Sequence, residues 1–182
     1  DLEIQTMNGA FGGTFTSRLN MNLREDKHWA YGAFSFLVGA IGQRPFMLYA
    51  PVQTDKTAES AAELLRESKD LIGPRPLTAD EIEKIKLGDV RSMPGEYQTT
   101  GSLLGAMTGI VAYDRPDDYV QTLKPRIESQ TDAAVQAAAN EIVRPDAFTW
   151  VIVGDLKKIE KPVRDLELGD VKVLNAEGKT VR

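Results

Sequence analysis

The sequence has 182 residues, of which 42% are hydrophobic and 27% are charged, with a formal net charge of −5. This is the balance of a globular domain large enough to bury a core. The absence of cysteine excludes a disulfide framework, a thiolate nucleophile and a cysteine-based zinc site. The interspersed charges give no basic surface for nucleic acid, and no apolar run approaches the ~20 residues of a membrane span.

The histidine count limits the chemistry further. His28 is the only histidine, whereas the zinc motifs H-E-x-x-H and H-x-x-E-H need two histidines about one helical turn apart. A Ser-His-Asp triad would require His28 as its base. The other ligand types within a turn of His28 are Glu25 and Asp26, so we expect no metal site in this chain.

The predicted elements begin with a helix that ends near Asp26. Its apolar positions Phe15, Leu19 and Leu23 stand at helical spacing, and the glycine pair Gly12-Gly13 can interrupt it. No strand precedes this helix in the sequence. We therefore expect Asp1 to mark a cut edge and residues 1–182 to form a single domain that is truncated at its N-terminal edge.

Two strands are predicted next, at Tyr31–Val38 and Phe46–Val52. The first is rich in aromatic and β-branched residues, and the second alternates apolar side chains on one face. The glycines and proline between them indicate an antiparallel hairpin. Several helices follow, with apolar positions at 58–72, 82–90, 103–111 and 135–142, a capping box at Thr78–Glu81 and a further short helix from Pro116.

The end of the chain adds two candidate strands. Phe148–Val153 is an almost continuous apolar run that predicts a buried central strand, and Val171–Leu174 could form a last one. We expect the tail 175–182 to be loose. Because strands and helices are segregated along the chain, the sequence predicts an α+β fold, with an antiparallel or mixed sheet and helices packed on one face.

Gly12–Glu25 is the most informative segment. It reads G-G-T-F-T-S-R-L-N-M-N-L-R-E and closely resembles the G-G-x-[FM]-x-S-R-L-x-x-x-[LIV]-R-E run of pitrilysin/insulinase-type zinc peptidases. In that family the run continues to an Ala-Tyr pair, here Ala30-Tyr31. Trp150–Asp155 is similar to the hydrophobic strand and Gly-Asp near the end of the same domain. The resemblance implies the carboxy-terminal, metal-free domain of such a peptidase, and so a C-terminal fragment of a larger protein.

The resemblance also implies how such a domain works. Members of the family enclose a chamber between two halves, one of which binds zinc through H-x-x-E-H and a distal glutamate. The metal-free half supplies an arginine and a tyrosine seven residues apart, which map onto Arg24 and Tyr31. We predict that these two residues donate hydrogen bonds to the substrate backbone and to the transition state.

Several residues near this pair allow more than one interpretation. Arg24 could instead pair with Glu25 or Asp26 at a solvated helix end. Arg18 could contact substrate or form a structural ion pair, and Gly12 and Gly13 could serve substrate approach or close packing. Many relatives have glycine and leucine at the positions of His28 and Trp29, and this departure leaves the predicted fold intact.

We therefore predict the substrate-binding, non-zinc domain of a zinc-dependent endopeptidase that cleaves peptides or unfolded segments, and we expect no activity from this chain alone. Zinc would sit in a partner half, on the same polypeptide or on a separate subunit, and substrate would add as a strand to a sheet edge. One alternative is a catalytically silent scaffold subunit of a larger assembly, and another is a free-standing ligand-binding module. The composition suits the bacterial periplasm and cytoplasm equally.

Overall fold

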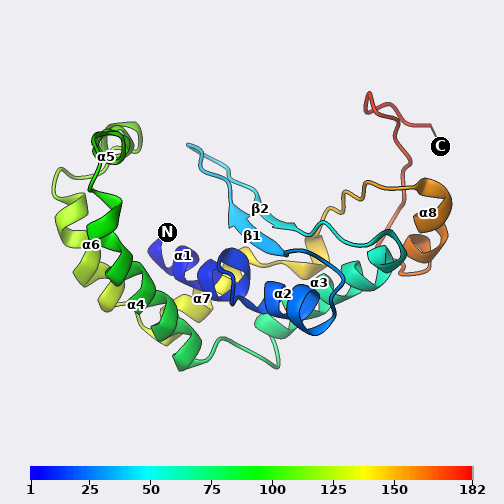
Figure 1. Cartoon of the computed structure of the whole chain (residues 1–182), viewed down its shortest axis with the longest axis horizontal. Coiled ribbons are helices and arrows are strands. Elements are labelled where there is room, and N and C mark those ends of the chain that lie inside the picture. The colour runs from blue at the N-terminus through cyan, green and yellow to red at the C-terminus, as the bar shows by residue number, and fades with distance from the viewer. Residues whose placement is uncertain (182) are drawn as a thin grey trace.

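The first part of the chain is helical but broken in its middle. The structure, a computed structural model, describes residues 1–181 (Figure 1). Its first helical segments are α1 (Leu2–Asn8), the π-helix η1 (Gly9–Gly13), α2 (Arg18–Asn20) and the π-helix η2 (Met21–Asp26). Thr14 is extended and separates η1 from α2. The predicted helix end at Asp26 and the break at the glycine pair are both confirmed.

The hairpin is confirmed, with shorter strands than predicted. β1 (Phe34–Leu37) pairs antiparallel with β2 (Phe46–Tyr49), and an isolated bridge joins Ala30 to Val52. Side chains alternate between two faces, so that Ser35 is buried against the helices while its neighbour Phe34 is exposed. The helices therefore cover one face of the hairpin, which confirms the predicted α+β class.

The remaining helices follow in the predicted order. They are the 3-10 turn η3 (Thr54–Lys56), α3 (Thr57–Leu71), α4 (Ala79–Glu96), α5 (Thr100–Ala112), α6 (Tyr119–Glu128), α7 (Asp132–Ile142), the 3-10 turn η4 (Pro145–Ala147) and α8 (Leu156–Arg164). The capping box is present, since Thr78 Oγ1 accepts from the Glu81 amide and Thr78 N donates to the Glu81 carboxylate. Helix α8 was not predicted, and α4 continues through Pro94. No described helix is long and apolar enough to cross a membrane.

The core lies where α1 and the segments after it pack between the hairpin and α7 (Figure 1). Its fully buried apolar side chains include Met7, Phe11, Leu19, Leu23, Leu71, Ile82 and Val135. Leu19 and Leu23 are core residues as predicted. Phe15 is not, because it falls in the break between η1 and α2 and is 56% exposed.

The prediction of a buried central strand at Phe148–Val153 is wrong. Phe148 and Trp150 are half-buried and pack edge to face, but Val151 and Val153 are 85% and 93% exposed. No backbone hydrogen bond joins this segment to the rest of residues 1–181. An extended segment without a paired neighbour is not a strand, and only alternate side chains reach the core.

The prediction of a last strand at Val171–Leu174 is also wrong. In this segment Leu174 alone forms a bridge, with Thr180. The tail folds back onto the segment, since the Val181 amide donates to the Val173 carbonyl at 2.8 Å. The predicted loose tail therefore forms an exposed turn up to residue 181, and residue 182 lies outside the described residues.

Candidate functional site

The structure brings Arg24 and Tyr31 together. The Arg24 guanidinium lies 4.5 Å from the centroid of the Phe15 ring and 4.9 Å from that of the Tyr31 ring. We call these three residues the Arg24 centre. The rings attract the cation through their π faces, and Arg24 Nε also pairs with Glu25 at 3.1 Å. Tyr31 is 86% exposed, and its hydroxyl makes no hydrogen bond to any described residue.

The backbone around Arg24 has an unusual conformation. Arg24 lies in the π-helix η2, a geometry that often occurs at functional sites. The next turn is closed by His28 at φ 57°, in the left-handed region that favours glycine. His28 Nδ1 lies 3.0 Å from the Arg24 carbonyl oxygen. Since a carbonyl oxygen can only accept a hydrogen bond, Nδ1 is the donor. The His28 side chain thus adds a hydrogen bond to the turn in which its own backbone takes this conformation.

The turn leading to Tyr31 is held from a second side. Gln53 Nε2 donates to the His28 carbonyl and the Gln53 amide donates to the Trp29 carbonyl, both at 2.9 Å. The ammonium groups of Lys27 and Lys56 lie 5.0 and 5.6 Å from the centroid of a Trp29 ring. Hydrogen bonds from Gln53 to two backbone carbonyls, together with the contacts of the Trp29 ring with Lys27 and Lys56, therefore hold the turn that precedes Tyr31.

The glycine pair packs closely against its neighbours. A Cβ on Gly12 would lie 2.5 Å from the Ser35 amide nitrogen and would also overlap the Ser35 hydroxyl. A Cβ on Gly13 would lie 2.7 Å from Asn8 Nδ2. Close packing therefore explains both glycines, and in particular Gly12 lets η1 approach β1. Their predicted part in substrate binding stays a prediction.

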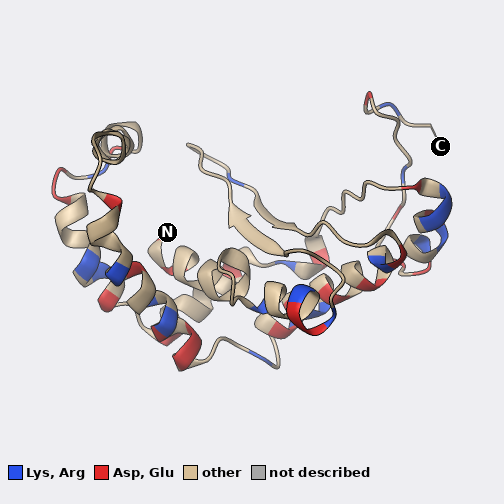
Figure 2. Ribbon diagram, in the orientation of Figure 1, with Lys and Arg blue, Asp and Glu red and all other residues tan. Residues whose placement is uncertain are grey.

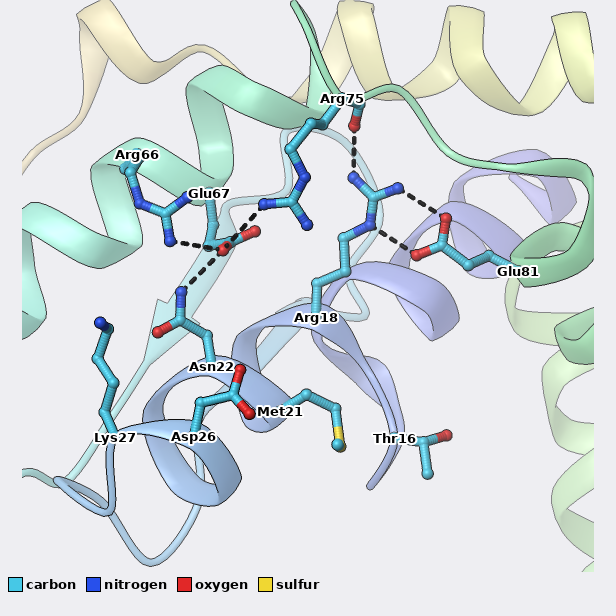
Figure 3. A pocket seen from close by; sticks show the side chains of 10 residues that line it. All are labelled: Thr16, Arg18, Met21, Asn22, Asp26, Lys27, Arg66, Glu67, Arg75 and Glu81. Carbon is cyan, nitrogen blue, oxygen red and sulfur yellow. Dashed lines mark hydrogen bonds and ion pairs between the residues drawn. The ribbon is translucent and has the colours of Figure 1, made fainter.

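Arg18 forms a structural ion pair. Its Nε and Nη2 atoms donate to the two Glu81 carboxylate oxygens at 2.6 Å, and its remaining bonds go to the carbonyls of Arg75 and Pro76 (Figure 3). Burial raises the pKa of Glu81, but hydrogen bonds from Arg18 and Thr78 outweigh burial and lower this pKa to about 2. Because Nε, Nη1 and Nη2 of Arg18 all have partners, the substrate contact predicted for this residue stays a prediction.

A polar pocket of about 380 Å³ adjoins η2 and Arg18 (Figure 3). At its base Glu67 accepts from Asn22 Nδ2 at 2.7 Å and from Arg66 Nη2 at 3.0 Å, and Arg75 lies 3.6 Å away. Asn22 also donates to Glu63 at 2.8 Å, which fastens η2 to α3. The pocket wall is thus an internal network of ion pairs that holds the helix carrying Arg24.

The residues present do not fit a zinc ion. Residues 1–181 contain no cluster of three or more His, Cys, Asp or Glu side chains able to hold a metal. The lone imidazole, His28, already has Nδ1 engaged with a carbonyl. Zinc ligands in catalytic sites are three protein side chains in tetrahedral geometry, so we derive no zinc chemistry from this chain.

Sequence reasoning missed two residues of this site. Phe15 was interpreted only as an apolar position of the first predicted helix, although the aromatic position of the G-G-x-[FM] pattern could have marked it. Asn20 is 1% exposed and bonds to the backbone at Phe15 and Ala33. No sequence signal singled it out, because the pattern places no restriction on that position.

Comparison with known proteins agrees with this α+β fold and with the Gly12–Glu25 pattern. Residues 1–88 match the family model described as the peptidase M16 inactive domain. This match confirms the resemblance to pitrilysin/insulinase-type peptidases that the Gly12–Glu25 pattern predicted. No curated protein matched the chain.

Crystal structures of bacterial proteins extend the likeness beyond residue 88. The peptidase M16 inactive domain from Pseudomonas fluorescens aligns with a TM-score of 0.69 and 19% identity, over 79% of this chain and 34% of that one. A protease from Helicobacter pylori gives 0.62 and 17%, over 79% and 34%. The inactive peptidase domain of a candidate zinc protease from Bordetella parapertussis gives 0.67 and 16%, over 79% and 77%. This chain thus spans about a third of the length of the Pseudomonas fluorescens and Helicobacter pylori proteins.

Proposed function

We propose that this chain is the substrate-binding, zinc-free part of a zinc-dependent endopeptidase, in which Arg24 and Tyr31 donate hydrogen bonds to the peptide backbone. The observation that carries the proposal is the Arg24 centre, where a guanidinium contacts two aromatic rings, one of them an exposed tyrosine whose hydroxyl has no hydrogen-bond partner among residues 1–181. The family match to an inactive peptidase domain supports the same role.

The chemistry of peptide hydrolysis suits these two side chains. The carbonyl oxygen of the scissile bond gains negative charge during attack, and preorganised donors aimed at it lower the barrier. Tyr31 offers one directional O–H donor, and Arg24 offers a permanent positive charge with several N–H donors. Donors that arrive from a separate half act only when the chamber closes, which couples catalysis to substrate enclosure.

A partner half would supply the zinc and the general base. Two exposed apolar surfaces are consistent with such a partner, since large uncovered apolar patches commonly mark interfaces. One is the outer face of the hairpin and the other is α5. Their exposed members are Phe34, Phe36, Met47 and Tyr49 on the hairpin, and Leu103, Leu104, Met107 and Val111 on α5.

The test is cleavage of a quenched fluorescent peptide by this chain alone, by the zinc-bearing half alone and by the two together. We expect cleavage that appears only in the mixture and that a chelator abolishes. Arg24→Ala should lower turnover of the mixture by about 10²–10³-fold. The matched control is Arg44→Ala, which removes a half-buried arginine paired with Asp1 and should leave turnover unchanged.

Two outcomes would overturn the proposal. Cleavage by this chain alone would show that it holds a complete active site. A mixture in which the two halves associate but cleave nothing would favour a scaffold subunit that keeps Arg24 and Tyr31 without using them.

A further inference from the structure

Asn20 connects the two aromatic sides of the Arg24 centre. It lies in α2 and is 1% exposed. Its Nδ2 donates to the Phe15 carbonyl at 2.6 Å, and its Oδ1 accepts from the Ala33 amide at 3.1 Å. Phe15 provides one ring of the centre, and Ala33 lies two residues after Tyr31, which provides the other. A single buried amide thus spans the backbone segments that carry both rings.

We propose that Asn20 is a positioning residue that sets the spacing of the Phe15 and Tyr31 rings around the Arg24 guanidinium. Its effect on peptide cleavage rests on the function proposed above, whereas its effect on the geometry of the centre does not. Asn20 touches no substrate in this account. It acts through the backbone of Phe15 and Ala33, in the two segments that carry the rings around Arg24.

The chemistry of the amide explains why asparagine suits this position. The two groups it meets have opposite requirements, because a carbonyl can only accept and a backbone amide can only donate. The orientation of the Asn20 side chain is therefore fixed by its partners. A carboxylate could accept the hydrogen bond from the Ala33 amide but could not donate one to the Phe15 carbonyl. An apolar side chain could make neither bond.

Burial makes the connection rigid. Ala33 is fully buried, and Leu19, next to Asn20, is fully buried as well. Water cannot replace the lost partner of a buried amide without opening the core. Removing Asn20 should therefore let the Phe15 and Ala33 segments move apart, and displacing a donor by about 1 Å can cost roughly 10²-fold in rate.

Gln136 provides a matched control. It lies in α7, where Oε1 accepts from the Leu77 amide at 3.0 Å and Nε2 donates to the Leu71 carbonyl at 2.9 Å. Gln136 therefore bridges one backbone donor and one backbone acceptor, as Asn20 does. None of its hydrogen bonds reaches the Arg24 centre. Gln136→Leu removes the same chemistry at a different place in the fold.

The direct test is the NMR resonance of the Arg24 Nε–H group in the full chain. In the native protein the ring currents of Phe15 and Tyr31 change the chemical shift of this group. The variants Phe15→Leu and Tyr31→Leu each remove one ring and so give the chemical shift expected without it. We expect Asn20→Leu to move the resonance toward those chemical shifts and Gln136→Leu to leave it in place. A folded Asn20→Leu protein with an unchanged resonance would overturn the proposal. If Asn20→Leu does not fold, Asn20→Ala removes both bonds without added apolar bulk and is judged by the same criterion.

Turnover of the mixture with the zinc-bearing half separates this proposal from the proposed function. We expect Asn20→Leu to lower kcat about 10²-fold with a smaller change in KM, and Gln136→Leu to lower neither. If the resonance moves but neither Asn20→Leu nor Arg24→Ala changes turnover, the positioning role holds and the proposed function fails. If Arg24→Ala lowers turnover while Asn20→Leu changes neither resonance nor kcat, the positioning role fails and the proposed function stands.

Discussion

The Arg24 centre and helix α5 are both exposed, yet they are held in opposite ways. Backbone and side-chain hydrogen bonds fix the centre from several sides, through Asn20, His28 and Gln53. Helix α5 has no buried side chain and no charged one, and Figure 2 shows it as an uncharged segment. The centre thus presents a charged group on a surface held by hydrogen bonds, whereas α5 presents an apolar surface whose side chains are left uncovered.

The two regions should differ most in their tolerance of a methyl group. Gly12→Ala places a Cβ against the Ser35 backbone, which cannot move aside without displacing β1, so we expect a loss of about 3 kcal/mol in the free energy of unfolding. Gly105→Ala in α5 meets no atom within 4 Å and should stabilise the helix by about 0.5 kcal/mol. Urea denaturation of both variants measures the contrast, and equal effects would contradict it.

The ion pair between Arg18 and Glu81 predicts a pH dependence of stability. Since the pKa of Glu81 is lowered from 4.5 to about 2 in the folded protein, its contribution to stability is complete above about pH 4.5 and is lost as the pH falls toward 2. Glu81 is partly exposed, so we expect Glu81→Gln to cost on the order of 2 kcal/mol at neutral pH. The loss should shrink as the pH falls from 4.5. Denaturation at several pH values tests this, with the exposed Glu83→Gln as the control expected to change nothing at any pH.

The left-handed turn at His28 predicts a smaller effect. His28→Ala keeps the unfavourable φ of 57° but removes the Nδ1 bond to Arg24, and should cost about 1–2 kcal/mol. His28→Gly also loses the bond but relieves the backbone, and should be close to neutral. Thermal unfolding would decide between them. A glycine variant that is less stable than the alanine variant would contradict the assigned turn.

Helix α5 should show the smallest effect on stability and a separate effect on association. Met107 is 65% exposed, so Met107→Gln should change the free energy of unfolding by less than about 0.5 kcal/mol. The same substitution should weaken binding to the zinc-bearing half, measured by titration calorimetry. Unchanged affinity would remove α5 from the interface, while Glu128→Gln on α6 serves as an exposed polar control.

Much of the fold followed from local sequence signals. Helical spacing, the capping box at Thr78–Glu81 and the hairpin residues are all short-range patterns, and each appears in the structure. The predicted strand Phe148–Val153 failed because pairing depends on a neighbouring strand, which an apolar run does not reveal. Helix α8 was missed because Pro162 interrupts a short polar pattern.

The site could be predicted only in part. The family resemblance named Arg24 and Tyr31 as a pair, and in the structure the Arg24 guanidinium lies 4.9 Å from the centroid of the Tyr31 ring. Their role as donors to substrate stays a prediction. Phe15 and Asn20 depend on how the break after Gly13 folds back onto β1. That long-range arrangement comes from packing between distant segments, so the sequence offered no local sign of it.

The most direct test of the account is the turnover of the mixed enzyme carrying Tyr31→Phe, which removes one hydroxyl and keeps the ring that contacts Arg24. Tyr49→Phe is the matched control, because it removes a hydroxyl from an exposed tyrosine of β2 and keeps the apolar ring that would contact the zinc-bearing half. We predict a loss of about 10²-fold or more in kcat for Tyr31→Phe and none for Tyr49→Phe. Equal, unchanged kcat values for the two variants would contradict the assignment of Tyr31 as a donor to the reacting peptide.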